Sequence, residues 1–451
     1  MKNNSVIYQL ALRSFTPEGT LKAAQKRIAH ISSLGVDIVY ICPFFVQDED
    51  ADISTWSKRQ RLSGTYNPKN PYKIVDYFDV DPEYGTSDDV KELVKVIHNC
   101  GMKVIFDLVY MHCGRNAVFA QEHPAYYLRN EDGSFHIPPG WPFPRLDFSN
   151  QELRDYLISN MEYHVDELGA DGFRCDMGDR VPLDFWRDAF DRIKVKHPDL
   201  ITLNEGVEPE TINGVFDWCY GWPGQYDRSF RKTMVNILTE NKPATELINF
   251  YRANYDDYGE NHKKLLLFMD NHDTASDSYM DRLEHVLGTS AVEASIVLES
   301  TYPGISFLWN GYEFCDNAEN CMFSNRYHGK RSAINWSMVF TKEVMERLAF
   351  IKNINAIRHE SDAIENGTTQ WIENSVPEHV ITFERVSKKQ RLIVAVNTKN
   401  ATLTVEMMQK NNVEPLISKG VEMQGDKFQF EPYGYIVAVC NGNDEGDTLR
   451  R

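Results

Sequence analysis

The sequence predicts an α/β protein: a (β/α)8 TIM barrel with a short inserted lobe after its third strand, followed by a C-terminal antiparallel β-sandwich. Strand-like and helix-like segments alternate from the N-terminus to about residue 355, as in a barrel of parallel strands. Several strand segments are continuous apolar runs, which is typical of parallel strands buried on both faces. After residue 358, short strands with turn-like spacers indicate the sandwich.

The first unit of the barrel shows the alternation clearly. Residues 6–12 (VIYQLAL) form the expected strand, and an apolar stripe at helical spacing follows from Leu21 to Ile31. Thr20 is placed to cap this helix and Gly35 to end it. The other expected strands are residues 36–45, 103–111, 170–176, 200–205, 216–222, 265–270 and 305–311. A doubly wound open sheet is the competing architecture, but the Gly-rich nucleotide-binding turn that it predicts after the first strand is absent from the sequence.

These segments divide the chain into a barrel, a lobe, a sandwich and a tail. We expect residues 1–111 and 151–358 to form the barrel. Residues 112–150 are rich in proline and aromatic residues and too long for a plain loop, so they predict a small lobe over the barrel mouth. Residues 359–440 predict the sandwich, and residues 441–451 a disordered polar tail.

The composition indicates a soluble globular protein, with 42% hydrophobic residues, 25% charged residues and a formal net charge of −18. An acidic surface repels phosphate groups, so we expect no nucleic-acid partner and no membrane partner. The N-terminus lacks the pattern of a signal peptide, which predicts a cytoplasmic protein, although a chain already trimmed of its leader would look the same. Eight cysteines without CxxC spacing predict reduced thiols.

Polar side chains gather at the predicted C-terminal ends of four strands, where barrels of this kind place their active sites. They are Asp107 and His112 after the third strand, Arg174 and Asp176 on the fourth, Glu205 on the fifth, and Asn271, His272 and Asp273 after the seventh. Carboxylates, two histidines and an arginine therefore converge on one mouth of the barrel.

Two of these carboxylates have the pattern of a glycosidase pair. Strand alternation places Arg174 and Asp176 on one face, so we expect the cation to lower the pKa of Asp176 and keep it ionised as a nucleophile. Glu205 follows an apolar strand, which predicts a raised pKa and a general acid. Carboxyl groups on neighbouring strands can approach to about 5–5.5 Å, the separation found in retaining glycosidases.

Six segments carry a resemblance to the α-amylase family of glycoside hydrolases. They are FDLVYMH (106–112), GFRCDMGDR (172–180), TLNEG (202–206), FMDNHD (268–273), the stretch before the third strand (71–107) and YPGISFLWNGYEF (302–314). The first four resemble the signature segments of the family, in the family's order and on the expected strands. The resemblance spans nearly the whole chain and implies the (β/α)8 fold and cleavage of α-glycosidic bonds.

The resemblance implies three catalytic carboxylates. Asp176 would be the nucleophile that forms the glycosyl-enzyme, and Glu205 would be the general acid and base. Asp273 would be the third carboxylate, which grips sugar hydroxyls and stabilises the transition state. The competing interpretation of Asp176 is a carboxylate in a buried structural ion pair.

The resemblance also implies substrate-binding residues around these carboxylates. Arg174 would orient the nucleophile, and His112 and His272 would hydrogen-bond the sugar in the cleavage subsite. Tyr72 would stack beneath the sugar ring; its alternative is a core or surface position. Asp107 would support Arg174 and is expected to be structural.

The sequence departs from the family at its usual structural calcium site. Met111 precedes His112 where many members have an asparagine, Arg145 stands at the position of an aspartate in the lobe, and Arg180 replaces a histidine after the nucleophile strand. A thioether and a guanidinium cannot coordinate a hard, oxygen-seeking cation, and Asp147 alone is too little to build another site. We therefore predict that this calcium site is lost and that no other metal or cofactor is needed.

A second departure lies on the side of the leaving group. Many members have a Lys-His pair after the nucleophile, whereas this chain has Asp179 and Arg180, which leaves its acceptor recognition open. The leading hypothesis is hydrolysis of α-1,4-linked glucose oligosaccharides or starch-type polysaccharide, with the α-glucan or oligosaccharide substrate as the expected partner. The alternatives are an α-glucan transglycosylase or a sucrose- or trehalose-converting enzyme with the same residues, and an inactive carbohydrate-binding protein.

Overall fold

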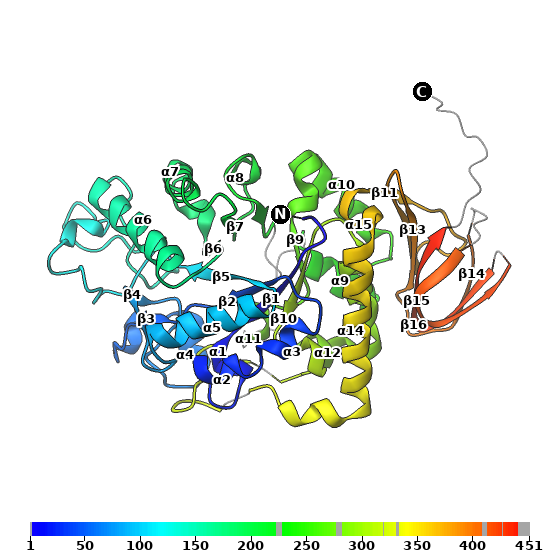
Figure 1. Ribbon diagram of the computed structural model, residues 1–451, viewed down its shortest axis with the longest axis horizontal. Helices are drawn as coiled ribbons and strands as arrows, with labels where there is room; N and C mark the ends of the chain where they lie inside the picture. Colours follow the sequence, from blue (N-terminus) through cyan, green and yellow to red (C-terminus); the bar gives the residue numbers. More distant parts are fainter. Residues whose placement is uncertain are drawn as a thin grey trace.

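A barrel of eight parallel strands forms the centre of the described chain in the computed structural model (Figure 1). The structure describes residues 2–221, 228–276, 282–318, 320–330, 333–407, 413–425 and 427–440. In chain order, the barrel strands are β1 (Val6–Leu10), β2 (Ile38–Ile41), β5 (Lys103–Leu108), β6 (Gly172–Cys175), β7 (Ile201–Asn204), β8 (Trp218–Cys219), β9 (Leu266–Phe268) and β10 (Ile305–Trp309). Each predicted barrel segment contains one of these strands, so the predicted fold class is confirmed.

The barrel closes on itself. Hydrogen bonds link the strands in the order β8-β7-β6-β5-β2-β1-β10-β9, with all neighbours parallel. A parallel bridge between Cys219 and Leu265 joins the two ends of this order. Closure leaves no exposed strand edge in the barrel and brings the carboxyl ends of all eight strands to one mouth.

A dense apolar core fills the barrel. Its members come from seven of the eight strands and their ends: Ile7, Ile38, Tyr40, Ile105, Ile201, Leu203, Trp218, Tyr220, Leu266, Phe268, Ile305 and Phe307. Each is at most 3% exposed, and burying each large apolar side chain stabilises the fold by about 1.5–3 kcal/mol. Because this core plugs the barrel, the polar side chains at the carboxyl ends form the floor of an open mouth.

Helices surround the barrel (Figure 1), except for α4 and α11, whose residues line the cavity at its mouth. The helices of the described chain are α1 (Leu12–Phe15), α2 (Leu21–Gln25), α3 (Ile28–Ser32), α4 (Lys58–Leu62), α5 (Ser87–Asn99), α6 (Gln151–Asp166), α7 (Leu183–Lys194), α8 (Pro209–Ile212), α9 (Phe230–Leu238), α10 (Glu246–Tyr258), α11 (His272–Ser276), α12 (Leu283–Leu287), α13 (Thr289–Thr301), α14 (Lys342–Glu360) and α15 (Asp362–Asn366). Thr20 caps α2 as predicted, by accepting a hydrogen bond from the Ala23 N–H. The predicted helix 21–31 is broken into α2 and α3 by a turn at Lys26 and Arg27.

The connection after β2 contains a two-stranded antiparallel ribbon that the sequence pattern does not predict. It consists of β3 (Phe45–Gln47) and β4 (Ile74–Val80), with the 3-10 turn η1 (Ile53–Thr55) and α4 between them. Two register shifts interrupt the pairing, and β4 lacks a strict alternation of buried and exposed residues, which explains the missing signal. Residues 48–73 between the two strands reach the mouth of the barrel.

The predicted lobe, 112–150, is held by short contacts rather than long strands. It contains the 3-10 turn η2 (Pro124–Tyr126) and the antiparallel bridges His112–Arg145, Tyr127–Leu146 and Arg129–Phe135. Four more 3-10 turns lie elsewhere in the described chain: η3 (Gly178–Arg180), η4 (Gly259–Lys264), η5 (Tyr312–Phe314) and η6 (Trp336–Phe340).

Six strands form the C-terminal antiparallel sheet, which packs beside α13 and α14 (Figure 1). They are β11 (Thr368–Trp371), β12 (Val380–Val386), β13 (Arg391–Asn397), β14 (Leu403–Glu406), β15 (Val413–Gln424) and β16 (Lys427–Cys440). Hydrogen bonds join them into one sheet, because the long β16 pairs with β13, β14 and β15. The sequence pattern does not predict β11 or β15; β11 is short and has no buried residue, and β15 is mostly exposed.

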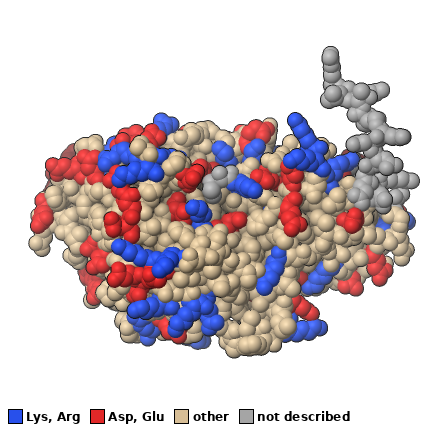
Figure 2. All heavy atoms as spheres, in the orientation of Figure 1, with Lys and Arg blue, Asp and Glu red and all other residues tan. Residues whose placement is uncertain are grey.

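Acidic and basic side chains are interspersed over the face of the molecule shown in Figure 2. None of the helices in the described ranges is long and apolar enough to cross a membrane. All eight cysteines are free thiols. The predicted tail 441–451, and Trp222 at the end of the predicted sixth strand, lie outside the described residues.

Candidate active site

Arg174 lies at the centre of a buried charge cluster. The register of β5 and β6 places it opposite Asp107, and its Nη1 donates to Asp107 Oδ1 at 2.6 Å. The same nitrogen donates to Asp176 Oδ1 at 2.9 Å. Its Nη2 forms an ion pair with Glu205, 2.8 Å from Oε2. One fully buried guanidinium therefore gathers carboxylates from three neighbouring strands, β5, β6 and the end of β7.

Burial has the largest effect on the pKa values of the two central carboxyl groups, those of Asp176 and Glu205. It raises the pKa of Asp176 well above the ordinary value; Arg174 opposes this rise and Glu205 adds to it. Burial also raises the pKa of Glu205. The predicted lowering of the pKa of Asp176 is therefore wrong in direction, because the cost of burying its charge exceeds the attraction of Arg174. Two buried carboxyl groups on one guanidinium take up protons as a pair.

The carboxylate of Asp107 is bound by Arg174 and by two tyrosine hydroxyl groups. Besides Arg174, its carboxylate accepts hydrogen bonds from the Tyr40 hydroxyl at 2.5 Å and the Tyr72 hydroxyl at 2.9 Å. The Tyr72 ring stacks on His272, with ring centroids 5.2 Å apart and an interplanar angle of 18°. These contacts give Asp107 a structural place under Arg174 and fix the orientation of the Tyr72 ring.

Two neutral histidines border the cluster. Burial lowers the pKa of His272 to about 4, against the effect of Asp273, and lowers the pKa of His112 to about 4. Gln9 Oε1 accepts from the His272 backbone N–H at 3.0 Å, so Gln9 Nε2 donates to His272 Nδ1 at 2.7 Å and the ring proton lies on Nε2. His112 Nε2 donates to the Tyr72 carbonyl at 2.8 Å.

Asp273 is bound by an arginine that the sequence analysis does not single out. Arg59 Nη1 donates to Asp273 Oδ1 at 2.5 Å, and its Nη2 donates to the Asp273 carbonyl at 3.0 Å. Burial favours the neutral acid, but His272 and Arg59 together hold the pKa of Asp273 well below its ordinary range. Asp273 therefore keeps its negative charge at a lower pH than an ordinary aspartate does.

A cavity of about 440 Å³ lies over the cluster. Its lining includes six of the seven predicted site residues: Tyr72, His112, Asp176, Glu205, His272 and Asp273. The seventh, Arg174, lies beneath and contacts two of them. The structure thus brings all the predicted residues together, and the cavity size suits a small-molecule site.

Several residues of the site are not predicted from the sequence. They are Gln9 behind His272, and Arg59, Trp141, Phe143, Tyr220 and Phe323 in the cavity lining. Gln9 has a usable signal, because it is a polar residue near the end of an otherwise apolar first strand. Arg59 has none, since it comes from the long connection after β2 and follows no barrel strand.

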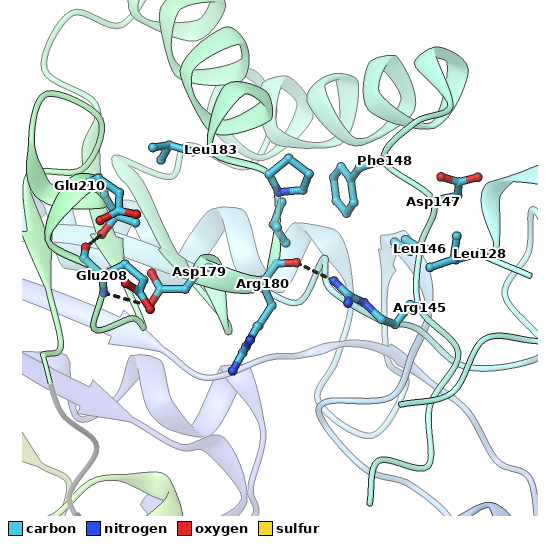
Figure 3. Close-up of a pocket in the computed structure, with 14 residues that line it drawn as sticks. Leu128, Arg145, Leu146, Asp147, Phe148, Asp179, Arg180, Leu183, Glu208 and Glu210 are labelled. Carbon is cyan, nitrogen blue, oxygen red and sulfur yellow. Dashed lines mark hydrogen bonds between the residues drawn. The ribbon is translucent and has the colours of Figure 1, made fainter. Parts of the chain in front are cut away.

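A second cavity, of about 420 Å³, lies beside the loop that follows Glu205 (Figure 3). Asp179 faces this loop: its Oδ2 accepts from the backbone N–H groups of Val207 at 2.5 Å and Glu208 at 3.2 Å. A Cβ on Gly206 would lie 2.0 Å from Asp179 Oδ1, so this close approach requires glycine. Asp179 therefore fixes the loop after Glu205 instead of presenting a free carboxylate.

The residues at the family's calcium position do not fit that ion. Arg145 Nη2 donates to the Arg180 carbonyl at 2.7 Å, which places a guanidinium on an oxygen that a metal would need (Figure 3). Asp147 turns away and accepts hydrogen bonds from Ser149 through its N–H at 3.0 Å and its hydroxyl at 2.7 Å. Within the described residues, no group of three or more His, Cys, Asp or Glu side chains is arranged to hold a metal.

We expect the chelator EDTA to leave both the melting temperature and the activity of the purified protein unchanged. A metal at 1,000 times its Kd would contribute about 4 kcal/mol to stability, and EDTA would remove that contribution as a clear fall in melting temperature. The measurement is a thermal melt with EDTA and with excess calcium. A tightly bound calcium in the 111–180 region would contradict the predicted loss of the site.

Comparison with known proteins agrees with this fold. Residues 3–138 match the family model described as the α-amylase catalytic domain. The chain is 23% identical over 427 residues to a cyclomaltodextrinase from Bacillus sp., covering 88% of this chain and 69% of that protein. It is 24% identical over 400 residues to α-amylase 2 from Dictyoglomus thermophilum, covering 84% and 64% of the two chains. The alignments thus span about two thirds of these relatives.

Solved structures share the whole architecture. The crystal structure of a noncanonic maltogenic α-amylase, AmyB from Thermotoga neapolitana, superposes with a TM-score of 0.78 over 97% of this chain and 99% of that one, at 23% identity. An α-amylase from Lactobacillus plantarum gives a TM-score of 0.77 at 20% identity, with the same coverage. The fold and the matched catalytic-domain segment define a glycoside hydrolase barrel. Residues 3–138 match the α-amylase family, and over most of its length the chain is similar to proteins named cyclomaltodextrinase and α-amylase.

Proposed function

We propose that this protein is a retaining α-glycosidase that hydrolyses α-1,4-linked glucose oligosaccharides or starch-type polysaccharide. The observation that carries the proposal is the Arg174 cluster, which holds Asp176 and Glu205 side by side at the edge of a cavity that Asp273 also lines. The relatives are named cyclomaltodextrinase, α-amylase and intracellular maltogenic amylase, which supports an α-glucan as the substrate.

In the first step, the ionised carboxylate of Asp176 attacks the anomeric carbon of the bound sugar. The bond from that carbon to the leaving oxygen breaks, and Glu205 transfers its proton to this oxygen. The raised pKa of Glu205 suits this step, because the general acid must still hold its proton when the bond to the leaving oxygen breaks. The product is a glycosyl ester on Asp176 and a released alcohol.

In the second step, the carboxylate of Glu205 takes a proton from water. The resulting hydroxide adds to the anomeric carbon and breaks the ester, which returns Asp176 to its charged form and leaves the proton on Glu205. The Met177 backbone N–H donates to Glu205 Oε2 at 3.0 Å and holds this carboxyl group in place for both steps. Two displacements at one carbon retain its configuration.

The remaining residues bind and orient the sugar. Asp273 is ionised and its side chain is partly exposed, so it can accept hydrogen bonds from sugar hydroxyl groups in the transition state. His272, with its proton on Nε2, donates to the same sugar, and His112 lines the same cavity. The fixed ring of Tyr72 provides the surface on which the sugar stacks. Arg174 orients both carboxyl groups from below.

The test is product analysis with maltooligosaccharides, pullulan, sucrose and trehalose. Hydrolysis predicts release of reducing sugar from maltoheptaose, with the α-anomer formed first. Disproportionation of maltoheptaose without net release would favour the transglycosylase alternative, since water and a sugar hydroxyl compete for the same glycosyl-enzyme. Conversion of sucrose or trehalose in preference to maltooligosaccharides would contradict the proposed substrate, and formation of the β-anomer would contradict the retaining mechanism.

A further inference from the structure

We propose that the active site acts on the non-reducing end of an α-glucan, because a wall across one side of the cavity excludes any sugar attached to O4 of the bound residue. This inference rests on the proposed function and specifies its substrate as a chain end. The wall, called the end wall below, consists of Arg59 and the segments 67–70 and 322–325.

Arg59 attaches the end wall to Asp273, the third catalytic carboxylate. It lies on α4 at the mouth of the barrel, and its guanidinium holds both the side chain and the backbone carbonyl of Asp273. Gln60, the next residue on α4, is buried and donates to the carbonyls of Asn67 at 2.8 Å and Pro68 at 3.0 Å. The short helix is therefore fixed to segment 67–70 as well as to Asp273.

The second segment of the end wall is tied to the first across the mouth. Asn67 is fully buried, and its Nδ2 donates to the Phe323 carbonyl at 2.9 Å. Asn70 from one segment and Met322 and Phe323 from the other line the same cavity as Asp273. A buried hydrogen bond thus closes the gap between two loops that come from different barrel strands.

A buried ion pair anchors the end wall to the barrel. Arg13 and Glu83, with side chains 5% and 4% exposed, form a two-bond ion pair, with both nitrogen–oxygen distances 2.8 Å. Arg13 Nη1 also donates to the Met322 carbonyl at 2.6 Å, and Asn325 Nδ2 donates to Glu83 Oε2 at 3.0 Å. Because charge-assisted bonds of this kind are strong, the wall is a rigid part of the scaffold rather than a loose loop.

The end wall faces Glu205 across the barrel. In the closed order β8-β7-β6-β5-β2-β1-β10-β9, the strand four places from β7 is β1. Segment 67–70 belongs to the connection after β2, and segment 322–325 follows β10; these strands are the two neighbours of β1. Glu205 ends β7, so the acid and the end wall stand on opposite sides of the mouth.

The geometry of the sugar ring explains why an end wall opposite Glu205 would favour chain ends. Glu205 must reach the glycosidic oxygen on C1, so the leaving group lies on its side of the mouth. C4 is opposite C1 in a pyranose ring, and O4 of the bound residue therefore points at the end wall. A chain continuing from O4 would meet Arg59 and Phe323, whereas a terminal residue has only a hydroxyl there, which the guanidinium and Asp273 can bind.

The experiment compares two 4-nitrophenyl maltoheptaosides, one free and one with O4 and O6 of its non-reducing end bridged by an ethylidene group. We expect the blocked substrate to be cleaved at least about 100-fold more slowly, because the block collides with the end wall. Unblocked maltoheptaose should release glucose as its first small product. Equal rates on both substrates, or internal cuts as first products, would overturn the inference. Failure to cleave any unblocked α-glucoside would instead overturn the proposed function.

Replacement of Arg59 tests whether this side chain excludes sugars attached to O4. We expect Arg59→Ala to raise the ratio of blocked to unblocked cleavage by about 10-fold or more, and Arg59→Lys to restore part of the exclusion. The matched control is Arg61→Ala on the same helix, whose side chain donates to the Trp56 carbonyl and does not line the cavity. A ratio is measured because loss of the Asp273 contact lowers both rates, and an unchanged ratio in Arg59→Ala would overturn the role of Arg59.

Discussion

Asp176→Asn is expected to lower kcat on every α-glucoside by at least about 10⁴-fold, because an amide cannot form the glycosyl ester. The variant should fold normally. Burial disfavours the charge of Asp176, so a neutral amide of the same shape removes that cost, and Arg174 keeps its contacts with Asp107 and Glu205. The measurements are kcat, the melting temperature, and mass spectrometry of wild-type protein trapped with 5-fluoro-α-glucosyl fluoride.

The control for this variant is Asp184→Asn, which neutralises a carboxylate whose side chain is 69% exposed and paired with Arg154. Its kcat should match the wild type. Trapping should add one fluoroglucosyl group to the peptide that contains Asp176. An unchanged rate in Asp176→Asn, or a label on a different carboxylate, would refute the assignment of the nucleophile.

Glu205→Gln is expected to lower kcat on maltooligosaccharides by about 10²–10⁴-fold, because both proton transfers lose their donor and acceptor. The leaving group of α-glucosyl fluoride is a fluoride ion, which needs no proton from a general acid. With this substrate the first step should therefore persist, and the glycosyl-enzyme should accumulate. Azide ions need no general base, so they should restore turnover and yield α-glucosyl azide. Recovery of the β-azide, or no rescue by azide, would contradict the role of Glu205.

The pH dependence provides a second readout for Glu205. Since burial raises its pKa, the wild-type activity should fall on the alkaline side at a pH above the ordinary carboxylate value, as the proton of the acid is lost. On the acid side, activity should fall as Asp176 takes up a proton. In Glu205→Gln assayed with α-glucosyl fluoride and azide, the alkaline limb should disappear. The control Glu167→Gln, on a side chain 61% exposed, should keep the wild-type profile.

The sequence predicted most of the barrel because its signals are local. A parallel strand buried on both faces is a continuous apolar run, and the polar residues of the site directly follow such runs, as Glu205 follows 200–204. Strands without this signal escaped prediction. The paired strands β3 and β4 have an irregular register, and β15 is mostly exposed. None of these three strands therefore has a clean alternation of apolar residues.

The sequence by itself therefore determined the barrel, the order of the polar strand ends, and the set of carboxylates, histidines and arginine that meet at the mouth. Tertiary structure decided their energetics and their surroundings. The net effect of Arg174 on Asp176 depends on burial, which no neighbouring residue in the chain reveals, and it reversed the predicted direction of the pKa shift.

Likewise, Arg59 meets Asp273 across 214 positions of sequence, and Arg145 meets the Arg180 carbonyl across 35. Periodicity and strand-end position describe a residue's own segment, whereas these contacts arise only when separate loops pack over the closed barrel. The residues that carry out the chemistry can thus be predicted from local sequence. The shape of the cavity that selects the substrate depends on contacts that form only in the tertiary fold.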